Sequence, residues 1–123
     1  MSKILMPINP IYVEKILSGT KKYEYRKTLP KKNIDKMIIY STSPIKKVIG
    51  EVEILEILID DKDKIWELTK NNSGIDKKFY NEYYKNKEVA VAYKLGKVTK
   101  YNKEKELSEY NINYSPQSFV YLD

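Results

Sequence analysis

The chain has 123 residues, of which 41% are hydrophobic and 33% charged, and its net charge is +6. This composition fits one folded domain over residues 1–123 and excludes a largely disordered chain. Cysteine and histidine are both absent, which excludes disulfides, thiolate zinc sites and histidine-based catalytic pairs. We expect no metal, no cofactor and no membrane partner. We also expect a cytoplasmic protein, because the opening residues lack the apolar core of a signal peptide.

The positive charge is concentrated in the first part of the chain. Residues 1–50 contain 11 basic and 3 acidic residues, whereas residues 51–123 contain 12 and 14. A basic half is typical of proteins that bind an anionic partner, above all nucleic acid. The abundance of lysine, isoleucine, asparagine and tyrosine also fits an AT-rich genome, which would raise the lysine content without any functional demand. An AT-rich genome does not explain why the sole arginine lies at position 26.

The first half of the chain shows a well-delimited helix between strands. Asn9 suits the N-cap, Pro10 the first helical position, and Gly19 the left-handed residue that follows the helix. In residues 21–27 tyrosines alternate with charged residues, which indicates a strand with Tyr23 and Tyr25 on one face. The elements predicted up to residue 59 are a strand at 3–8, a helix at 9–19, and strands at 21–27, 36–43 and 46–59, the last with a bulge near Gly50.

The second half predicts two helices and returning strands. Four aromatic residues in the second helix occur at helical spacing and either stack on bases or, as the simpler interpretation, pack against the sheet. The predicted elements are helices at 60–72 and 77–86, strands at 88–101 and 117–122, and a weaker segment at 105–112. The aromatic residues are Phe79, Tyr80, Tyr83 and Tyr84. Because strands and helices do not alternate as βαβ units, the order predicts an α+β fold, a small curved sheet or barrel with helices packed on it.

Residues 19–26, GTKKYEYR, combine the sole arginine with a glutamate two positions earlier. On a strand, Glu24 and Arg26 project from the same face and can contact one another or hold one ligand between them. An arginine offers paired hydrogen bonds to a phosphate or a base edge, which a lysine cannot reproduce. Glu24 can accept from an amine, and Lys21 adds a charge at the turn. An ordinary surface ion pair on an edge strand explains the same spacing.

The motif G-x-K-x-x-E-x-R formed by Gly19, Lys21, Glu24 and Arg26 resembles the signature of the ASCH domain, a branch of the PUA-like superfamily. The resemblance covers most of the chain. It extends to the stretches INPIYVEKILSGTKKYEYRK, IIYSTSPIKKVIGEVEI, FYNEYYKNKEVAVAYKLG and SPQSFVYL, which look like small bacterial stand-alone ASCH proteins. It implies a PUA-like β-barrel of about five or six strands with helices packed around it. It also implies a cleft beside the motif that binds RNA or a modified nucleotide.

The motif and its expected neighbours define the candidate ligand-binding residues. The start of the first helix is included because its free N–H groups can hold a phosphate. The loop after the third strand and the segment before the last strand are expected beside the same cleft. The candidates are Lys21, Glu24, Arg26, Asn9, Ser41, Thr42, Ser43, Lys46 and Gln117.

Three functions remain open at this level. The first is binding of RNA or a modified nucleotide, with a regulatory role as an option. The second is hydrolysis in the same cleft, as an amidohydrolase acting on an acylated nucleoside or as a ribonuclease, with Lys21 and Glu24 as the catalytic residues. Family members that look like amidohydrolases use a lysine, a threonine and a glutamate, and Glu24 stands where that threonine would be. Arg26 beside Glu24 favours a charged carboxylate, which suits binding better than proton transfer. The third is a protein-interaction module for an acidic partner.

Overall fold

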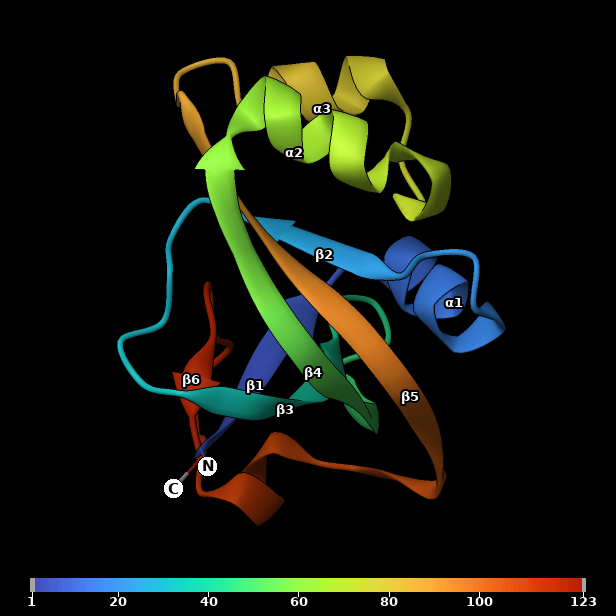
Figure 1. Ribbon diagram of the computed structural model, residues 1–123. Coiled ribbons are helices and arrows are strands. Elements are labelled where there is room, and N and C mark those ends of the chain that lie inside the picture. The colour runs from blue at the N-terminus through green and yellow to red at the C-terminus, as the bar shows by residue number, and fades with distance from the viewer. Residues whose placement is uncertain (1, 123) are drawn as a thin grey trace.

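The computed structural model describes residues 2–122 and shows a strongly twisted sheet with two helices stacked at one end (Figure 1). A third helix lies beside the sheet. The elements in chain order are β1 (Ser2–Ile8), α1 (Pro10–Ser18), β2 (Tyr23–Arg26), β3 (Ile34–Ser41), β4 (Lys47–Asp61), α2 (Lys62–Thr69), η1 (Lys70–Asn72), α3 (Lys77–Tyr83), β5 (Val89–Lys105), η2 (Leu107–Tyr110) and β6 (Val120–Tyr121).

The six strands form one mixed sheet in the order β2-β5-β4-β3-β1-β6. The pair β1 and β3 is parallel, and the other neighbours are antiparallel. The α+β class and the number of strands are therefore as expected. The sheet is curved but not closed into a barrel, because the edge strands β2 and β6 have no ladder between them within residues 2–122. The open edge places β2 next to the helices.

The helix cap, the helix end and the strand bulge predicted from the sequence are all present in the structure. Asn9 caps α1 by accepting a hydrogen bond from the N–H of Ile11 at 3.0 Å. Gly19 ends the helix in the left-handed region with φ 86°. The bulge expected in β4 is present, with register shifts on both sides of Gly50. A Cβ at Gly50 would overlap the carbonyl oxygen of Thr99, so the close approach of β5 requires glycine there.

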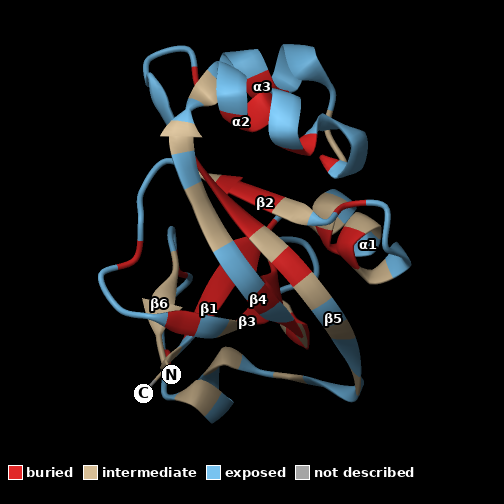
Figure 2. Cartoon of the chain, in the orientation of Figure 1, coloured by how far each residue is buried: buried red, intermediate tan, exposed pale blue. Residues whose placement is uncertain are grey.

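Three hydrophobic clusters hold these elements together, and Figure 2 shows their buried residues in red. Two of them position the site. The larger one lies between the sheet and α1. The smaller one fastens α2 and α3 to the end of β2 and β5, and its main aromatic members are Tyr25, Trp66, Tyr80 and Tyr84. Because α3 is attached through this second cluster, its remaining exposed face lies next to β2.

The boundaries differ from the prediction in the second half of the chain. The helix expected at 60–72 is divided into α2 and the short 3₁₀ helix η1, and α3 ends earlier than expected, at Tyr83. Strand β5 continues past Gly96 to Lys105, because a glycine there leaves room for the side chain of Leu55. The last strand is reduced to Val120–Tyr121. No helix formed by residues 2–122 is long and apolar enough to cross a membrane.

Candidate functional site

Strand β2 separates apolar from charged side chains across its two faces. It pairs antiparallel with residues 91–94 of β5, so its direction is fixed by the longest strand of the sheet. Tyr25 is buried in the cluster that holds α2 and α3, and its ring stacks edge-on against Tyr80. Glu24 and Arg26 project from the opposite face and contact one another. The alternation read from the sequence is therefore present in the strand.

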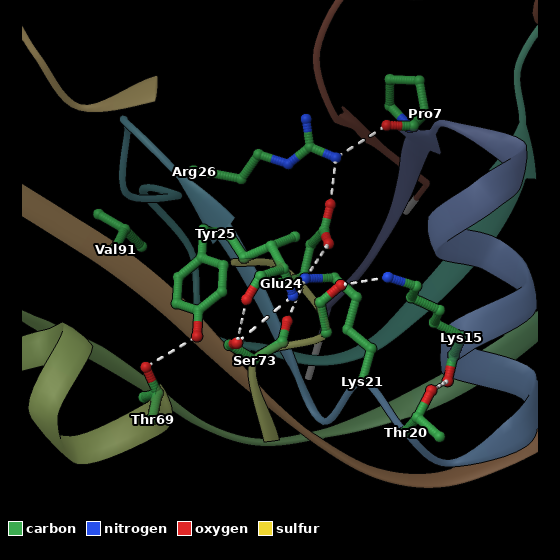
Figure 3. A network of polar contacts seen from close by, with 12 residues as sticks. Pro7, Lys15, Thr20, Lys21, Glu24, Tyr25, Arg26, Thr69, Ser73 and Val91 are labelled. Atoms are coloured by element: carbon green, nitrogen blue, oxygen red, sulfur yellow. Dashed lines mark hydrogen bonds and ion pairs between the residues drawn. The ribbon is translucent and has the colours of Figure 1, made fainter. Parts of the chain in front are cut away.

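Glu24 bridges two cations (Figure 3). One carboxylate oxygen accepts a hydrogen bond from Nη2 of Arg26 at 2.5 Å, and the other lies 3.8 Å from Nζ of Lys21. Nη2 of Arg26 also donates to the carbonyl oxygen of Pro7 at 2.9 Å. Glu24 is only 5% exposed, so this ion pair is far less screened by water than a surface pair.

Lys21 is buried, with 3% of its surface exposed. Its ammonium group donates to the carbonyl oxygen of Ser73 at 2.8 Å and lies 4.9 Å from the ring centre of Tyr25 and 5.4 Å from that of Tyr12. Burial lowers the pKa of Lys21 below the usual value of 10.5, and Glu24 opposes this by favouring the charged form. A lysine with a lowered pKa in a cleft is typical of a functional site.

The loop before α3 fits closely around Lys21. Gly74 has φ 71°, and a Cβ at this position would come within 2.5 Å of Cβ of Lys21. The carbonyl oxygen of Gly74 accepts a hydrogen bond from Nζ of Lys15 at 2.8 Å. The N–H of Lys22 donates to the carbonyl oxygen of Asn72 at 2.9 Å. This loop therefore positions the lysine of the motif.

A hollow of about 190 Å³ lies beside these three charged residues, and we refer to it as the β2 cleft. Arg26, Glu24 and Lys21 form its polar wall. The residues that form the aromatic wall belong to α1, β2 and α3 and are Tyr12, Tyr25, Phe79 and Tyr83. Aromatic side chains and a guanidinium group beside one concave surface suit a flat ligand with an attached anion.

The aromatic residues of α3 serve two purposes. Tyr80 and Tyr84 are buried against the sheet, as the packing interpretation predicts. Phe79 and Tyr83 lie on the other face of the helix and line the β2 cleft. Because the pairs are each four residues apart, one helix presents one pair to the core and the other to the cleft.

The structure brings some of the predicted residues together and separates others. Lys21, Glu24, Arg26 and Asn9 all line the β2 cleft. Ser41 is buried in a different hollow, between α1 and the far part of β5, and the adjacent turn carries Thr42, Ser43 and Lys46. Gln117 lines a second hollow that shares Arg26 and Tyr83 with the cleft.

Two contributions to the site were not predicted from the sequence. The first is the carbonyl oxygen of Pro7 at the end of β1, which fixes Arg26. The second is the 73–74 segment, which holds Lys21 and Lys15. Backbone groups carry no side-chain signal, and the only hint in the sequence is the glycine at 74, which the left-handed conformation requires.

The model of the ASCH domain matches residues 6–111, a span that includes the whole β2 cleft. The chain belongs to the ASCH domain family. It is 29% identical over 118 residues to a protein of Zymomonas mobilis named ASCH domain-containing ribonuclease, covering 92% of this chain and 79% of that protein. The crystal structure of the Zymomonas ASCH protein superimposes with a TM-score of 0.89 at 25% identity, over 98% of this chain and 87% of that one.

Two relatives in Ureaplasma parvum are much longer than this chain. One is named large ribosomal subunit protein uL22 and is 39% identical over 98 residues, which is 80% of this chain and 32% of that protein. The other is named ATP synthase subunit alpha and is 33% identical over 120 residues, which is 97% of this chain but 15% of that protein. The chain therefore spans about a third of one relative and about a seventh of the other.

Proposed function

We propose that this ASCH-domain chain binds single-stranded RNA, with one base in the β2 cleft and a phosphate on Arg26. The observation that carries the proposal is the state of the Arg26 guanidinium group. Its Nη2 is occupied by Glu24 and Pro7, while the donors on Nε and Nη1 have no partner within residues 2–122. A guanidinium has five N–H donors, so three make no hydrogen bond on a group that two contacts hold in place. The donor on Nε is buried, and the two on Nη1 can meet a ligand. Such a group suits a phosphate.

The dimensions of the cleft favour an unpaired base. A hollow of about 190 Å³ is smaller than the roughly 300–1,000 Å³ of sites for drug-sized ligands, so it accepts a single ring system and not a duplex. Tyr12, Phe79 and Tyr83 offer ring faces and edges on which a base can stack. Single-stranded RNA exposes bases for such stacking, whereas an A-form helix does not. The Zymomonas relative is named a ribonuclease, which adds independent support for RNA as the ligand.

The test is the affinity of a fluorescein-labelled single-stranded RNA measured by fluorescence anisotropy at several salt concentrations. We expect binding that weakens as salt increases, because lysines and Arg26 displace counterions from the phosphates. Arg26→Ala should cost about 1–3 kcal/mol of binding free energy. Lys103→Ala is the matched control, since Lys103 is exposed on β5 and lines neither hollow. Equal affinity of the wild type and Arg26→Ala would contradict the proposal.

A second candidate function is cleavage of the bound RNA, and Lys21 favours it. The lowered pKa of Lys21 increases the fraction of neutral amine, which can accept a proton from an attacking hydroxyl group while Arg26 stabilises charge on the phosphate. Denaturing gels with labelled RNA provide the assay, and acylated nucleosides are tested in parallel for amide hydrolysis. Lys21→Met should abolish cleavage and retain binding. A wild-type protein that binds RNA and releases no product would restrict the function to binding.

The regulatory role and the acidic protein partner stay predictions of the sequence alone. Neither depends on the β2 cleft. The RNA assays therefore test the cleft without deciding these two hypotheses.

A further inference from the structure

A second hollow of about 150 Å³ adjoins the β2 cleft on the other side of Arg26. Arg26 and Tyr83 line both hollows, so these two side chains form the boundary between them. The other polar residues of the second hollow come from the end of β2 and from the segment before β6, and they are Lys27, Thr28, Gln117 and Ser118.

The two hollows differ in chemistry. The β2 cleft is walled by aromatic rings, and its one carboxylate, Glu24, is paired with Arg26 and Lys21. The second hollow is also lined by the apolar side chains of Met6, Tyr83 and Phe119, but it adds hydroxyl and amide groups and two cations, and it has no carboxylate among its lining residues. Aromatic walls suit a base, whereas hydroxyl, amide and cationic groups suit a ribose and its phosphates.

The boundary between the hollows is held in place. Nζ of Lys27 lies 4.7 Å from the ring centre of Tyr83, and Tyr83 stacks edge-on against the buried Tyr84 with ring centres 4.8 Å apart. Arg26 is fixed by Glu24 and Pro7, and its Nε is buried without a partner within the described residues. A phosphate between the hollows would meet the unpaired Nη1 donors of Arg26 on this fixed boundary.

We propose that the second hollow is a subsite for the neighbouring nucleotide, so that the RNA strand crosses Arg26 from one hollow to the other. This inference rests on the proposed function and narrows its ligand to an oligonucleotide of at least two residues. Size supports it. Neither hollow alone reaches the roughly 300 Å³ at which ligand sites begin, and the two together do. A single nucleoside in the β2 cleft would leave the second hollow empty.

The test compares adenosine 5′-monophosphate, adenosine 3′-monophosphate and the dinucleotide ApA in NMR titrations of the ¹⁵N-labelled full chain. The wild type should bind ApA about tenfold more tightly than either monophosphate, as expected for one additional stacked and hydrogen-bonded nucleotide. Gln117→Ala and Lys27→Ala should each reduce that advantage about threefold or more. Lys103→Ala should leave the ratio unchanged. Backbone signals around residues 27–28 and 117–118 should shift with ApA.

The possible failures are distinguishable. If ApA and the monophosphates bind equally well and Gln117→Ala changes nothing, the subsite is refuted while RNA binding in the β2 cleft stands. If ApA binds more tightly but Gln117→Ala and Lys27→Ala retain the full advantage, the neighbouring nucleotide lies elsewhere and the proposal is also wrong. If a labelled longer RNA fails to bind as well, the proposed function itself fails. Thermal unfolding of each variant verifies that the fold is intact.

Discussion

The β2 cleft and the turn between β3 and β4 were expected to form one site, and the fold treats them differently. In the cleft, Lys21 and Glu24 are 3% and 5% exposed and contact each other, backbone carbonyls and aromatic rings. In the turn, Ser43 and Lys46 are exposed, and the loop is closed by backbone bonds such as that from the N–H of Thr42 to the carbonyl oxygen of Ile8 at 3.0 Å.

The difference shows that burial, not residue type, distinguishes the two regions. Both carry the hydroxyl groups or cations that a nucleotide ligand needs. Only the cleft fixes its charged groups by packing and hydrogen bonds, so a ligand there meets donors that are already oriented. A lysine on an exposed turn must lose side-chain freedom on binding, which reduces what its charge contributes. Each of the following variants tests this contrast.

The largest effect is expected for Glu24→Ala. Removal of this carboxylate leaves Lys21 buried beside Arg26 without an anion, which should lower the free energy of unfolding by about 3 kcal/mol. The matched control is Glu67→Ala, which breaks an ion pair with Lys70 on the exposed face of α2. The control should cost far less, because water screens exposed pairs. Urea denaturation measures both, and comparable losses would refute the special role of burial in the cleft.

The next effect is expected for Gly74→Ala, with Gly19→Ala as its control. Both glycines have positive φ, 71° and 86°, so alanine strains the backbone at either position by about 1 kcal/mol. At Gly19 an added Cβ meets nothing within 4 Å, whereas at Gly74 it collides with the side chain of Lys21. Gly74→Ala should therefore destabilise the fold more and should also weaken RNA binding.

The pKa of Lys21 shows whether Gly74 positions this lysine or only stabilises the loop. Carbon-detected NMR of the Lys21 side chain should show its pKa returning toward the ordinary value in Gly74→Ala, because the displaced chain is better hydrated. In Gly19→Ala it should stay lowered. An unchanged Lys21 titration in Gly74→Ala would mean that the glycine only shapes the loop.

A smaller effect is expected for Lys21→Met, which should change how the free energy of unfolding depends on pH. The pKa of Lys21 is lowered by burial in the folded chain and normal, at 10.5, in the unfolded one, so the unfolded chain binds more protons between the two values. The contribution of Lys21 to stability should therefore increase with pH across this window. Relative to Lys21→Met, the wild type should gain stability as the pH rises from the lowered pKa of folded Lys21 toward 10.5.

Buried tyrosines lower the stability as the pH rises, which is opposite to the effect of Lys21. They are present in both the wild type and Lys21→Met, so their contribution cancels when the two proteins are compared. Burial raises the pKa of Tyr25 and of Tyr93 to about 12, so their contribution is lost as the pH increases above 10.0 in both proteins. Urea denaturation of the wild type and of Lys21→Met at matched pH values isolates the lysine. The same substitution at the exposed Lys85 is the control. A difference that is flat with pH would show that Lys21 keeps its ordinary pKa.

Much of this architecture could be read from local patterns. The cap at Asn9, the left-handed Gly19 and the alternation of β2 depend on neighbours in the sequence, and each is present as predicted. The G-x-K-x-x-E-x-R motif indicated the family because it fixes four positions together with their order along the chain. That residues 1–123 form a single domain stays a prediction.

The remaining parts of the site depend on how distant segments meet. Ser73 is 52 residues from Lys21 in the sequence, and their contact follows from the packing of α2 and α3 on the end of the sheet. Helical spacing predicted four aromatic residues on this helix but not which of them face the core. That choice depends on Trp66 and Tyr25, which pack on Tyr80. The sheet stays open for a similar reason, since strand pairing is decided over the whole chain.

The smallest effect is expected for Lys46→Ala, which removes a cation from the exposed turn between β3 and β4. Lys46 adopts φ 54° on an exposed turn, outside both hollows, so it can add only long-range charge to RNA binding. The affinity should fall less than about threefold, and the dependence on salt should decrease by no more than about one counterion. Fluorescence anisotropy at two salt concentrations measures both. If Lys46→Ala weakened binding as much as Arg26→Ala, the RNA would have to pass over the β3–β4 turn, and the buried cations of the cleft would not dominate recognition.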